Sequence, residues 1–401
     1  QVKPEEIAMA SLSTTLATNA LVEGQGGRVA LVYIGFRPGD LIRHGLSEVL
    51  AGDPAIELPG GHDHAGSEQQ PLDLRALQSW IEAQTGVSAF AVAGQFATRN
   101  AAHEEAELKE AGASAIVPGR RGVAFEGDDK VLYKICMHSR FAVRVLRFLT
   151  SFEAKNPDDL YRQGARFAWE ELLDKEGTFV VDATVNSEGF SHSHFAALKL
   201  KDAIVDRFRG KTGMRPSIDK DRPDLRLNLH IAGEKVTISV DASGEQLSRR
   251  GYRPASAKAP LNEVLAAGLL ALSGWRPGTP LYDPMCGSGT FSTEAALWAS
   301  GLPIQAGRKH FAFMDWSDFD QDVWKEVRRE AMASIQPVET TIFASDEHGG
   351  AVRQTMQSLE DADVESLVQV KQLDFFKLEP QTEGGFLVFN PPYGERMDPG
   401  D

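Results

Sequence analysis

The sequence predicts a protein of mixed α/β and α+β class, built from three successive segments. In the first and last thirds, short apolar runs alternate with stretches of helical periodicity, as in parallel α/β sheets. The middle third mixes strands and helices without a glycine-rich loop, which favours an α+β binding module. Charge follows the same division, because residues 113–260 hold 25 basic and 20 acidic side chains whereas both flanking segments are acidic.

Two strands and one helix are expected in the first segment. The apolar runs 28–33 and 88–96 have the length of strands, and residues 74–83 have the apolar period of a helix. The loop that precedes this helix contains His62 and His64. A histidine pair in a polar loop is typical of a solvated turn, so we expect no metal site.

The middle segment alternates in a less regular way. Apolar residues recur at helical spacing over 131–149, and 195–208 is an amphipathic helix with basic residues on its surface. The remaining expected elements are a helix at 104–111 and strands at 122–126, 178–185, 225–230 and 235–240.

The last segment predicts a parallel, doubly wound sheet. A helix at 262–272 comes first, and a second helix at 291–299 follows the first strand. Ligands of such sheets bind at the carboxyl ends of the strands. The expected strands are 280–282, 341–344, 367–372 and 386–389.

A glycine-rich loop, DPMCGSGT, follows the first of these strands and opens a helix. Glycine lets the backbone turn sharply and approach a ligand, and the free amides of a helix start can meet a carboxylate or phosphate. The candidate binding residues in this loop are Asp283, Cys286, Gly287, Gly289 and Thr290.

Two acids follow the next two strands. Asp346 can accept hydrogen bonds from both hydroxyls of a ribose, and Asp374 can accept from an adenine amino group. Each acid alone is more typical of a helix cap or turn. Their order behind the glycine loop favours a nucleoside site.

The motif NPPY follows the last strand. An amino group conjugated to a heterocycle is a poor nucleophile because its lone pair is delocalised into the ring. The amide oxygen of Asn390 and the carbonyl of Pro391 could accept hydrogen bonds from the two N–H groups of this amine. These bonds would aim its lone pair at an electrophilic methyl group. Tyr393 could stack on a base taken out of its helix. The geometry suits any planar amine, so adenine or a glutamine amide stays an alternative.

Together these motifs resemble those of the THUMP-containing 23S rRNA guanine-N2 methyltransferases, which use S-adenosylmethionine. GVAFEGD, ALKLKDAIVDRF, RPSIDKDRPDLRLN and RGYR also match, and the similarity covers about residues 104–401. The resemblance implies a THUMP RNA-binding module in the middle and a Rossmann-like class I methyltransferase domain after it. One departure is His348, which stands where the family commonly has a second Asp, so the ribose contact depends on Asp346 alone.

By the same resemblance, basic residues of the middle segment form an RNA face for 23S rRNA or a large-subunit assembly intermediate. A solvated helix face is the alternative interpretation. The candidate residues are Lys199, Lys201, Arg207, Arg209, Lys211, Arg215, Arg250 and Arg253.

The two ends of the chain lead to further expectations. Residues 13–37 and the loop before the first helix are similar to an internal piece of the hydantoinase/oxoprolinase family. Eight residues follow Tyr393, whereas the methyltransferase sheet normally continues through three more strands, so we expect a truncated catalytic sheet. The expected domains are 1–103, 104–258 and 259–401. A non-catalytic RNA-binding fragment is therefore the alternative to an active methyltransferase.

Composition favours the cytoplasm. The chain has only two cysteines, too few for a disulfide framework, and no run of about 18–20 apolar residues that could span a membrane. At the seam near residue 103, we expect the strand 90–96 and the helix up to Ala111 to pack together against 123–149, because the apolar face of a 131–149 helix needs cover.

Overall fold

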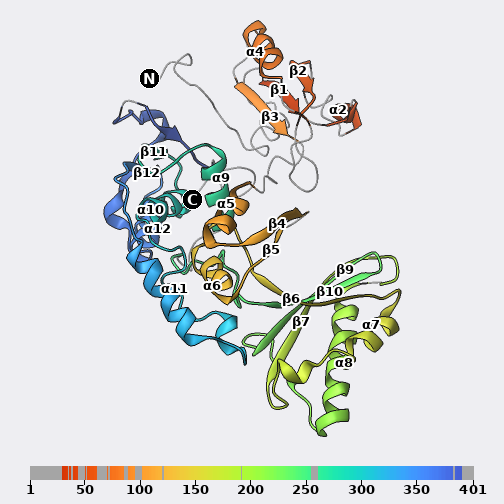
Figure 1. Cartoon of the computed structure of the whole chain (residues 1–401). Helices are drawn as coiled ribbons and strands as arrows, with labels where there is room; N and C mark the ends of the chain where they lie inside the picture. The colour runs from red at the N-terminus through yellow and green to blue at the C-terminus, as the bar shows by residue number, and fades with distance from the viewer. Residues whose placement is uncertain are drawn as a thin grey trace. The chain divides into compact units, whose positions relative to one another are not determined.

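The computed structural model forms two compact units (Figure 1). The first contains residues 1–126, 252–301 and 336–401, and the second contains 127–251 and 302–335. The residues that the structure describes are 29–34, 36–37, 39–43, 50, 52–60, 70, 73–84, 89–94, 102–119, 122–190, 192–253, 261–382 and 384–390. Within these ranges, no helix combines the length and the apolar character that crossing a membrane requires.

A three-stranded parallel sheet lies at the start of the first unit, with strand order β2-β1-β3. Its central strand β1 is buried from Ala30 to Tyr33, and Asp73 caps the helix α4 by accepting from two backbone amides. The elements are β1 (Val29–Ile34), α2 (Asp40–Arg43), β2 (Ala55–Leu58), α4 (Leu74–Ala83) and β3 (Ala89–Gly94).

The expectation for the seam was wrong for the strand. β3 pairs with β1 in parallel along all six residues of both strands, so its ladder belongs to the N-terminal sheet. The helix α5 (Ala102–Ala111) contacts a separate antiparallel hairpin of β4 (Ser114–Gly119) and β5 (Gly122–Glu126). A full backbone ladder to a buried neighbour outweighs the proximity of the strand to the next helix along the chain.

The second unit is an α+β layer, as the sequence predicted. Its mixed sheet has the order β6-β10-β9-β7-β8, and alternate residues of β9 from Leu225 to Ile231 are buried. The buried residues of α8 include Leu200 and Phe208, and Figure 1 shows α7 and α8 on one side of the sheet. The elements are α6 (Asp129–His138), β6 (Leu146–Glu153), α7 (Pro157–Gly164), η2 (Trp169–Glu171), β7 (Thr178–Asn186), α8 (Ser193–Thr212), β8 (Ser217–Ile218), β9 (Leu225–Ala232) and β10 (Lys235–Asp241).

The single helix expected over 131–149 was also wrong. α6 ends at His138, and β6 begins at Leu146. Ser139 stops the helix in an extended conformation, and its hydroxyl accepts from the amide of Ala142. Pairing of β6 with β10 then supplies the backbone hydrogen bonds that helix continuation would have supplied.

Residues 302–335 join the second unit although they lie between elements of the C-terminal sheet in sequence. Lys130 of α6 forms ion pairs with Glu326 and Glu330 at 2.9 and 2.8 Å. The ring of Tyr133 stacks on Phe313 with 4.3 Å between centroids. The two elements of this segment are η3 (Ala312–Asp315) and α11 (Gln321–Ala333).

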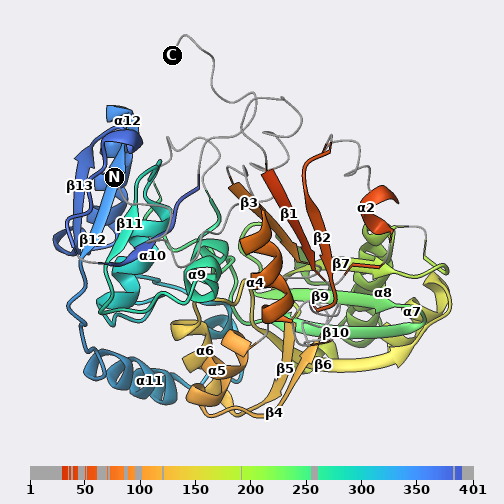
Figure 2. The ribbon, with the colours of Figure 1, turned by 90° about the horizontal axis from the view of Figure 1, so that it is seen from above.

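The C-terminal sheet is parallel throughout, as predicted, with strand order β13-β12-β11-β14. Figure 2 shows β12 between β11 and β13, with α10 and α12 beside them. The carboxyl ends of parallel strands meet at one edge, so this edge collects the motif residues. The elements are α9 (Glu263–Leu272), β11 (Leu281–Asp283), α10 (Thr290–Ala299), β12 (Ile342–Asp346), α12 (Gly349–Asp361), η4 (Glu365–Leu367), β13 (Val368–Gln372), η5 (Phe375–Lys377) and β14 (Phe386–Leu387).

Candidate active site at the carboxyl edge of the C-terminal sheet

The glycine-rich loop connects β11 to α10 and depends on two glycines with positive φ. Gly287 has φ +56° with open space where a Cβ would stand. Gly289 has φ +78°, and a Cβ there would lie 2.8 Å from the methyl carbon of Thr355. Gly289 therefore permits close packing on α12, whereas Gly287 leaves the outer side of the loop open. Thr290 is buried as the first residue of α10.

Asp346 lies at the end of β12 and is joined directly to this loop. Its Oδ2 accepts from the backbone N–H of Gly287, and its Oδ1 accepts from that of His348, both at 3.0 Å. A carboxylate has about four lone-pair positions, so two remain for further donors. The imidazole Nδ1 of His348 lies 3.5 Å from Oδ1.

Asp283 is buried at the end of β11, with only part of its hydrogen-bonding capacity used. Its Oδ2 accepts from the hydroxyl of Ser292 at 2.6 Å, whereas its Oδ1 has no partner in the described part of the chain. Burial, with a smaller contribution from the nearby charge of Asp346, raises the pKa of Asp283 to about 7, against the opposing effect of the hydrogen bonds from Ser292. The Oδ1 atom therefore remains available to accept from a ligand donor.

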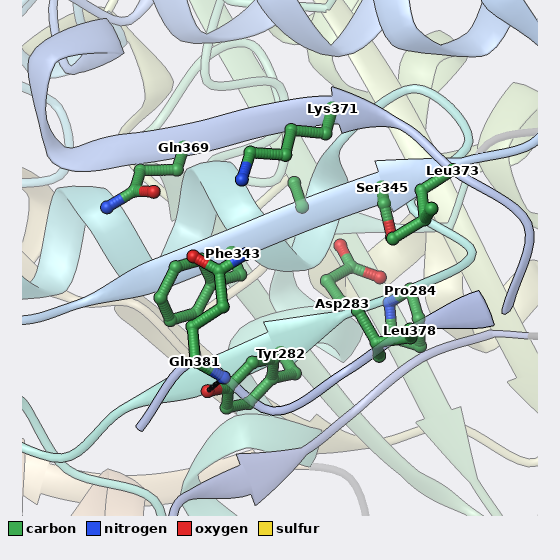
Figure 3. Close-up of a pocket in the computed structure, with 11 residues that line it drawn as sticks. Tyr282, Asp283, Pro284, Phe343, Ser345, Gln369, Lys371, Leu373, Leu378 and Gln381 are labelled. Carbon is green, nitrogen blue, oxygen red and sulfur yellow. Dashed lines mark hydrogen bonds between the residues drawn. The ribbon is translucent and has the colours of Figure 1, made fainter. Parts of the chain in front are cut away.

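A pocket lies next to Asp283, on the same strands (Figure 3). Figure 3 shows the rings of Tyr282 and Phe343 along one wall, and they stack with 4.8 Å between centroids. The Tyr282 hydroxyl accepts from the amides of Gln381 and Thr382, which fixes the connection between β13 and β14. The lining residues are Tyr282, Asp283, Pro284, Phe343, Ala344, Ser345, Gln369, Lys371, Leu373, Leu378 and Gln381.

Cys286 is buried in the glycine-rich loop, in surroundings that disfavour its thiolate form. Burial raises the pKa of its thiol far above the ordinary value, with the charge of Asp283 as the next cause. Its sulfur lies 3.3 Å from the hydroxyl oxygen of Thr355. The residue therefore packs the loop against α12 rather than supplying a thiolate.

Asp374 lies two residues beyond β13, after the strand that the sequence predicted. It caps η5 by accepting from the amide of Phe376 at 2.9 Å, and Lys377 lies 3.4 Å away. Phe376 itself is 90% exposed, and the sequence analysis did not single it out. An aromatic pair directly after the acid was the available signal, because an exposed ring can stack on a planar ligand.

The NPPY motif is described only at its start. Asn390 follows β14 and is half-buried at the same sheet edge. Pro391 and Tyr393 lie outside the described residues, so their predicted roles stay predictions. His62 and His64 also lie outside the described residues.

The predicted RNA-face residues differ in how the structure holds them. Arg207 donates to both carboxylate oxygens of Glu170 at 2.7 Å and to the carbonyls of Ala165 and Arg166. Lys211 also pairs with Glu170, and Lys199, Lys201 and Arg209 pair with Asp158, Asp202 and Asp206.

Of the three arginines outside α8, Arg250 and Arg253 are also held internally, whereas Arg215 is exposed. Arg250 donates to the carbonyls of Leu247 and Arg140. Arg253 pairs with Glu263 at 2.8 Å. Arg215 has no ion pair among the described residues.

Four family models match consecutive parts of the chain. They are the hydantoinase/oxoprolinase N-terminal region at 1–111, the RlmL ferredoxin-like domain at 103–146, the THUMP domain at 154–241 and the RMKL-like methyltransferase domain at 250–400. A Synechocystis protein named as an RNA methyltransferase is 38% identical over 292 residues, which are 73% of this chain and 76% of that protein. The chain belongs to the RMKL-like methyltransferases.

Other relatives and solved structures agree with this family. The ribosomal RNA large subunit methyltransferases K/L of Magnetococcus marinus and Syntrophotalea carbinolica are 39% and 40% identical over 73% of this chain, which spans 42% of each of them. A Listeria monocytogenes structure described as an N6-adenine-specific DNA methylase is 29% identical, with a TM-score of 0.65 over 73% of this chain and 77% of its own. The structure of SMU.472, a methyltransferase in complex with SAH, is 26% identical with a TM-score of 0.65, over 73% and 78%.

Membership confirms two expectations from the sequence. The RMKL-like domain is a methyltransferase of class I fold, and a THUMP domain precedes it. The match of the first residues to the hydantoinase/oxoprolinase family is confirmed as well. The site residues and the domain boundaries stay predictions.

Proposed function

We propose that this RMKL-like methyltransferase transfers a methyl group from S-adenosylmethionine to the exocyclic N2 amine of a guanine in 23S rRNA. One observation carries the proposal: Asp283, the glycine-rich loop, Asp346 and Asn390 share one sheet edge, and Asp346 is bonded to the loop. In this proposal, the cofactor site and the amine-binding motif share this edge.

The residues present fit S-adenosylmethionine. Asp283 offers a buried acceptor without a donor, which suits the ammonium group of the methionine part. Asp346 retains lone pairs for two ribose hydroxyls, and the open space at Gly287 lets the ligand approach the backbone. Bound there, the cofactor supplies an electrophilic methyl group. The SAH bound to the relative SMU.472 supports the same cofactor class.

Asn390 activates the acceptor amine in this proposal. Its side-chain oxygen accepts a hydrogen bond from one amine N–H and the Pro391 carbonyl accepts from the other, so the nitrogen becomes pyramidal and its lone pair is less delocalised into the ring. The contribution is positioning and electrostatic stabilisation, without a strong base. Tyr393 holds the base by stacking. The proton released after transfer passes to water.

The RNA substrate follows from the relatives. The K/L proteins are named for large-subunit ribosomal RNA, and the Synechocystis protein for RNA. The THUMP domain gives this chain a module separate from the methyltransferase domain, in the segment with excess basic charge. A ribosomal RNA substrate agrees with the cytoplasmic location expected from the sequence.

The proposal is tested by incubating the 401-residue chain with 23S rRNA and methyl-labelled S-adenosylmethionine, followed by nucleoside mass spectrometry. We expect labelled N2-methylguanosine. In Asn390→Ala, transfer should fall about 100-fold or more while binding of S-adenosylhomocysteine changes less than about threefold, since the lost contact acts mainly in the transition state. Asp322→Ala, an exposed change in α11, is the control.

A second candidate is methylation of adenine N6, which the description of the Listeria structure favours. In the same assay, labelled N6-methyladenosine would establish this candidate and exclude guanine N2. RNA binding without any labelled nucleoside would support a non-catalytic RNA-binding role instead.

A further inference from the structure

Two hydroxyls of α12 hold the glycine-rich loop from its inner side. The Thr355 hydroxyl donates to the carbonyl oxygen of Gly287 at 3.0 Å, and the Ser358 hydroxyl donates to that of Ser288 at 2.8 Å. Thr355 is 0% exposed and Ser358 is 1% exposed. The two hydroxyls lie three residues apart on α12, and they bond the carbonyls of two consecutive loop residues.

These bonds determine which way the loop amides point. In a trans peptide the carbonyl and the next N–H lie on opposite sides, and the described chain has no cis peptide. Drawing the Gly287 carbonyl toward α12 therefore turns the Ser288 N–H away from it. This N–H has no acceptor among the described residues, whereas the Gly289 N–H donates to the backbone carbonyl oxygen of Cys286 at 2.7 Å.

Gly287 is thus fixed at both ends. Its N–H is held by Asp346 and its carbonyl by Thr355, which fixes a φ of +56° in a residue that, without a Cβ, could adopt several other conformations. No atom lies within 4 Å of the Gly287 Cβ position, so the loop leaves open space at the residue before the Ser288 N–H. A donor on the open side of the loop suits the carboxylate of an amino-acid ligand.

We infer that Thr355 and Ser358 are positioning residues that preset the loop for the methionine carboxylate of the cofactor. The inference rests on the proposed function. It extends the site to a helix that no motif in the sequence marks, 68 and 70 residues beyond the loop carbonyls it holds. Neither side chain touches the ligand, because both hydroxyls are buried beneath the loop.

The experiment measures S-adenosylhomocysteine binding to the 401-residue chain by calorimetry, with the thermal unfolding midpoint of each ligand-free variant. Thr355→Val keeps the shape and removes the hydroxyl, so we expect Kd to rise about tenfold, the loss of roughly one hydrogen bond. Thr355→Ser restores the hydroxyl and should bind within about twofold of wild type. Ser358→Ala should weaken binding about threefold to tenfold.

Ser273→Ala is the matched control, since the Ser273 hydroxyl also donates to a helix carbonyl, that of Leu270, at the end of α9. Its Kd should equal that of wild type. Wild-type affinity in both Thr355→Val and Ser358→Ala would overturn the inference, as would equal losses in Thr355→Val and Thr355→Ser, which indicate packing alone. If Thr355→Val does not fold, Ser358→Ala decides. Absence of binding by the wild-type chain would overturn the proposed function itself.

Discussion

Gly287 donates its backbone N–H to the carboxylate of Asp346 over 3.0 Å, although the two residues are 59 positions apart in the sequence. The bond connects the loop after β11 to the end of the neighbouring strand β12. One acid thereby shapes the glycine-rich loop and retains lone pairs for a ligand.

Asp346→Ala should weaken S-adenosylhomocysteine binding by about a hundredfold or more, because it removes a charged acceptor for ribose and frees the Gly287 amide. Calorimetry measures the change. Asp322→Ala, on the exposed side of α11, should bind as wild type. Unchanged binding in Asp346→Ala would remove this residue from the site.

Cofactor affinity should depend on the charge of Asp283. Its pKa is raised to about 7 by burial, so the carboxylate is mostly protonated at pH 6 and mostly ionised at pH 8. An ammonium group binds the ionised form, so affinity should be about tenfold higher at pH 8 than at pH 6. Asp283→Asn should bind weakly with no such pH dependence. A pH-dependent Asp283→Asn variant would assign the effect to another group.

The same shift predicts the sign of a stability change. The pKa of Asp283 is higher in the folded state than in the unfolded state. The stability that its protonated form gives the fold is therefore fully present below about pH 4 and is lost as pH rises toward 7. Urea denaturation should therefore show Asp283→Asn gaining stability relative to wild type between pH 5 and pH 8. A constant difference across this range would contradict the assignment.

Gly289→Ala should destabilise the fold by about 2–4 kcal/mol, because φ is +78° and the new Cβ would lie 2.8 Å from Thr355. Gly210→Ala is the matched control. Gly210 lies within α8 with nothing within 4 Å of its Cβ position, so alanine should stabilise by about 0.5–1 kcal/mol. Denaturant midpoints with equal losses in both variants would show that the loop does not require glycine at 289.

The RNA face is tested best at Arg215, since it is exposed and makes no ion pair among the described residues. Arg215→Gln should lower the slope of log Kd against log salt by about 0.7–0.9, the effect of one lost phosphate contact. Fluorescence binding to a 23S rRNA fragment between about 50 and 200 mM KCl measures it. An unchanged slope would exclude Arg215 from the face.

Arg207 is expected to act differently. Its bonds to Glu170 and to two backbone carbonyls tie α8 to the segment around η2, so Arg207→Gln should cost about 2 kcal/mol of stability. The salt slope of RNA binding should not change. A loss of slope without a loss of stability would assign Arg207 to the RNA face.

Local sequence patterns determined most elements of this protein and the order of its candidate site. Apolar patterns predicted β7, β9 and β10 of the five-stranded sheet and all four strands of the C-terminal sheet, since side chains of a strand point alternately to its two faces. The positions of the glycine-rich loop, Asp346 and Asn390 at strand ends followed from the parallel sheet, and the family was confirmed by its relatives.

Only the tertiary structure decided what depends on distant partners. The helical spacing over 131–149 could not show that Leu146–Glu153 pairs with β10 as a strand. Similarly, the apolar run before α5 could not show that β3 pairs with β1. Residues 302–335 pack in the second unit rather than with the C-terminal sheet, because they form an ion pair and an aromatic stack with α6. Thr355 and Ser358 hold the loop through hydrogen bonds that no local sequence pattern predicts. A buried hydroxyl needs a hydrogen-bond partner, and tertiary packing decides which carbonyl lies close enough to be that partner.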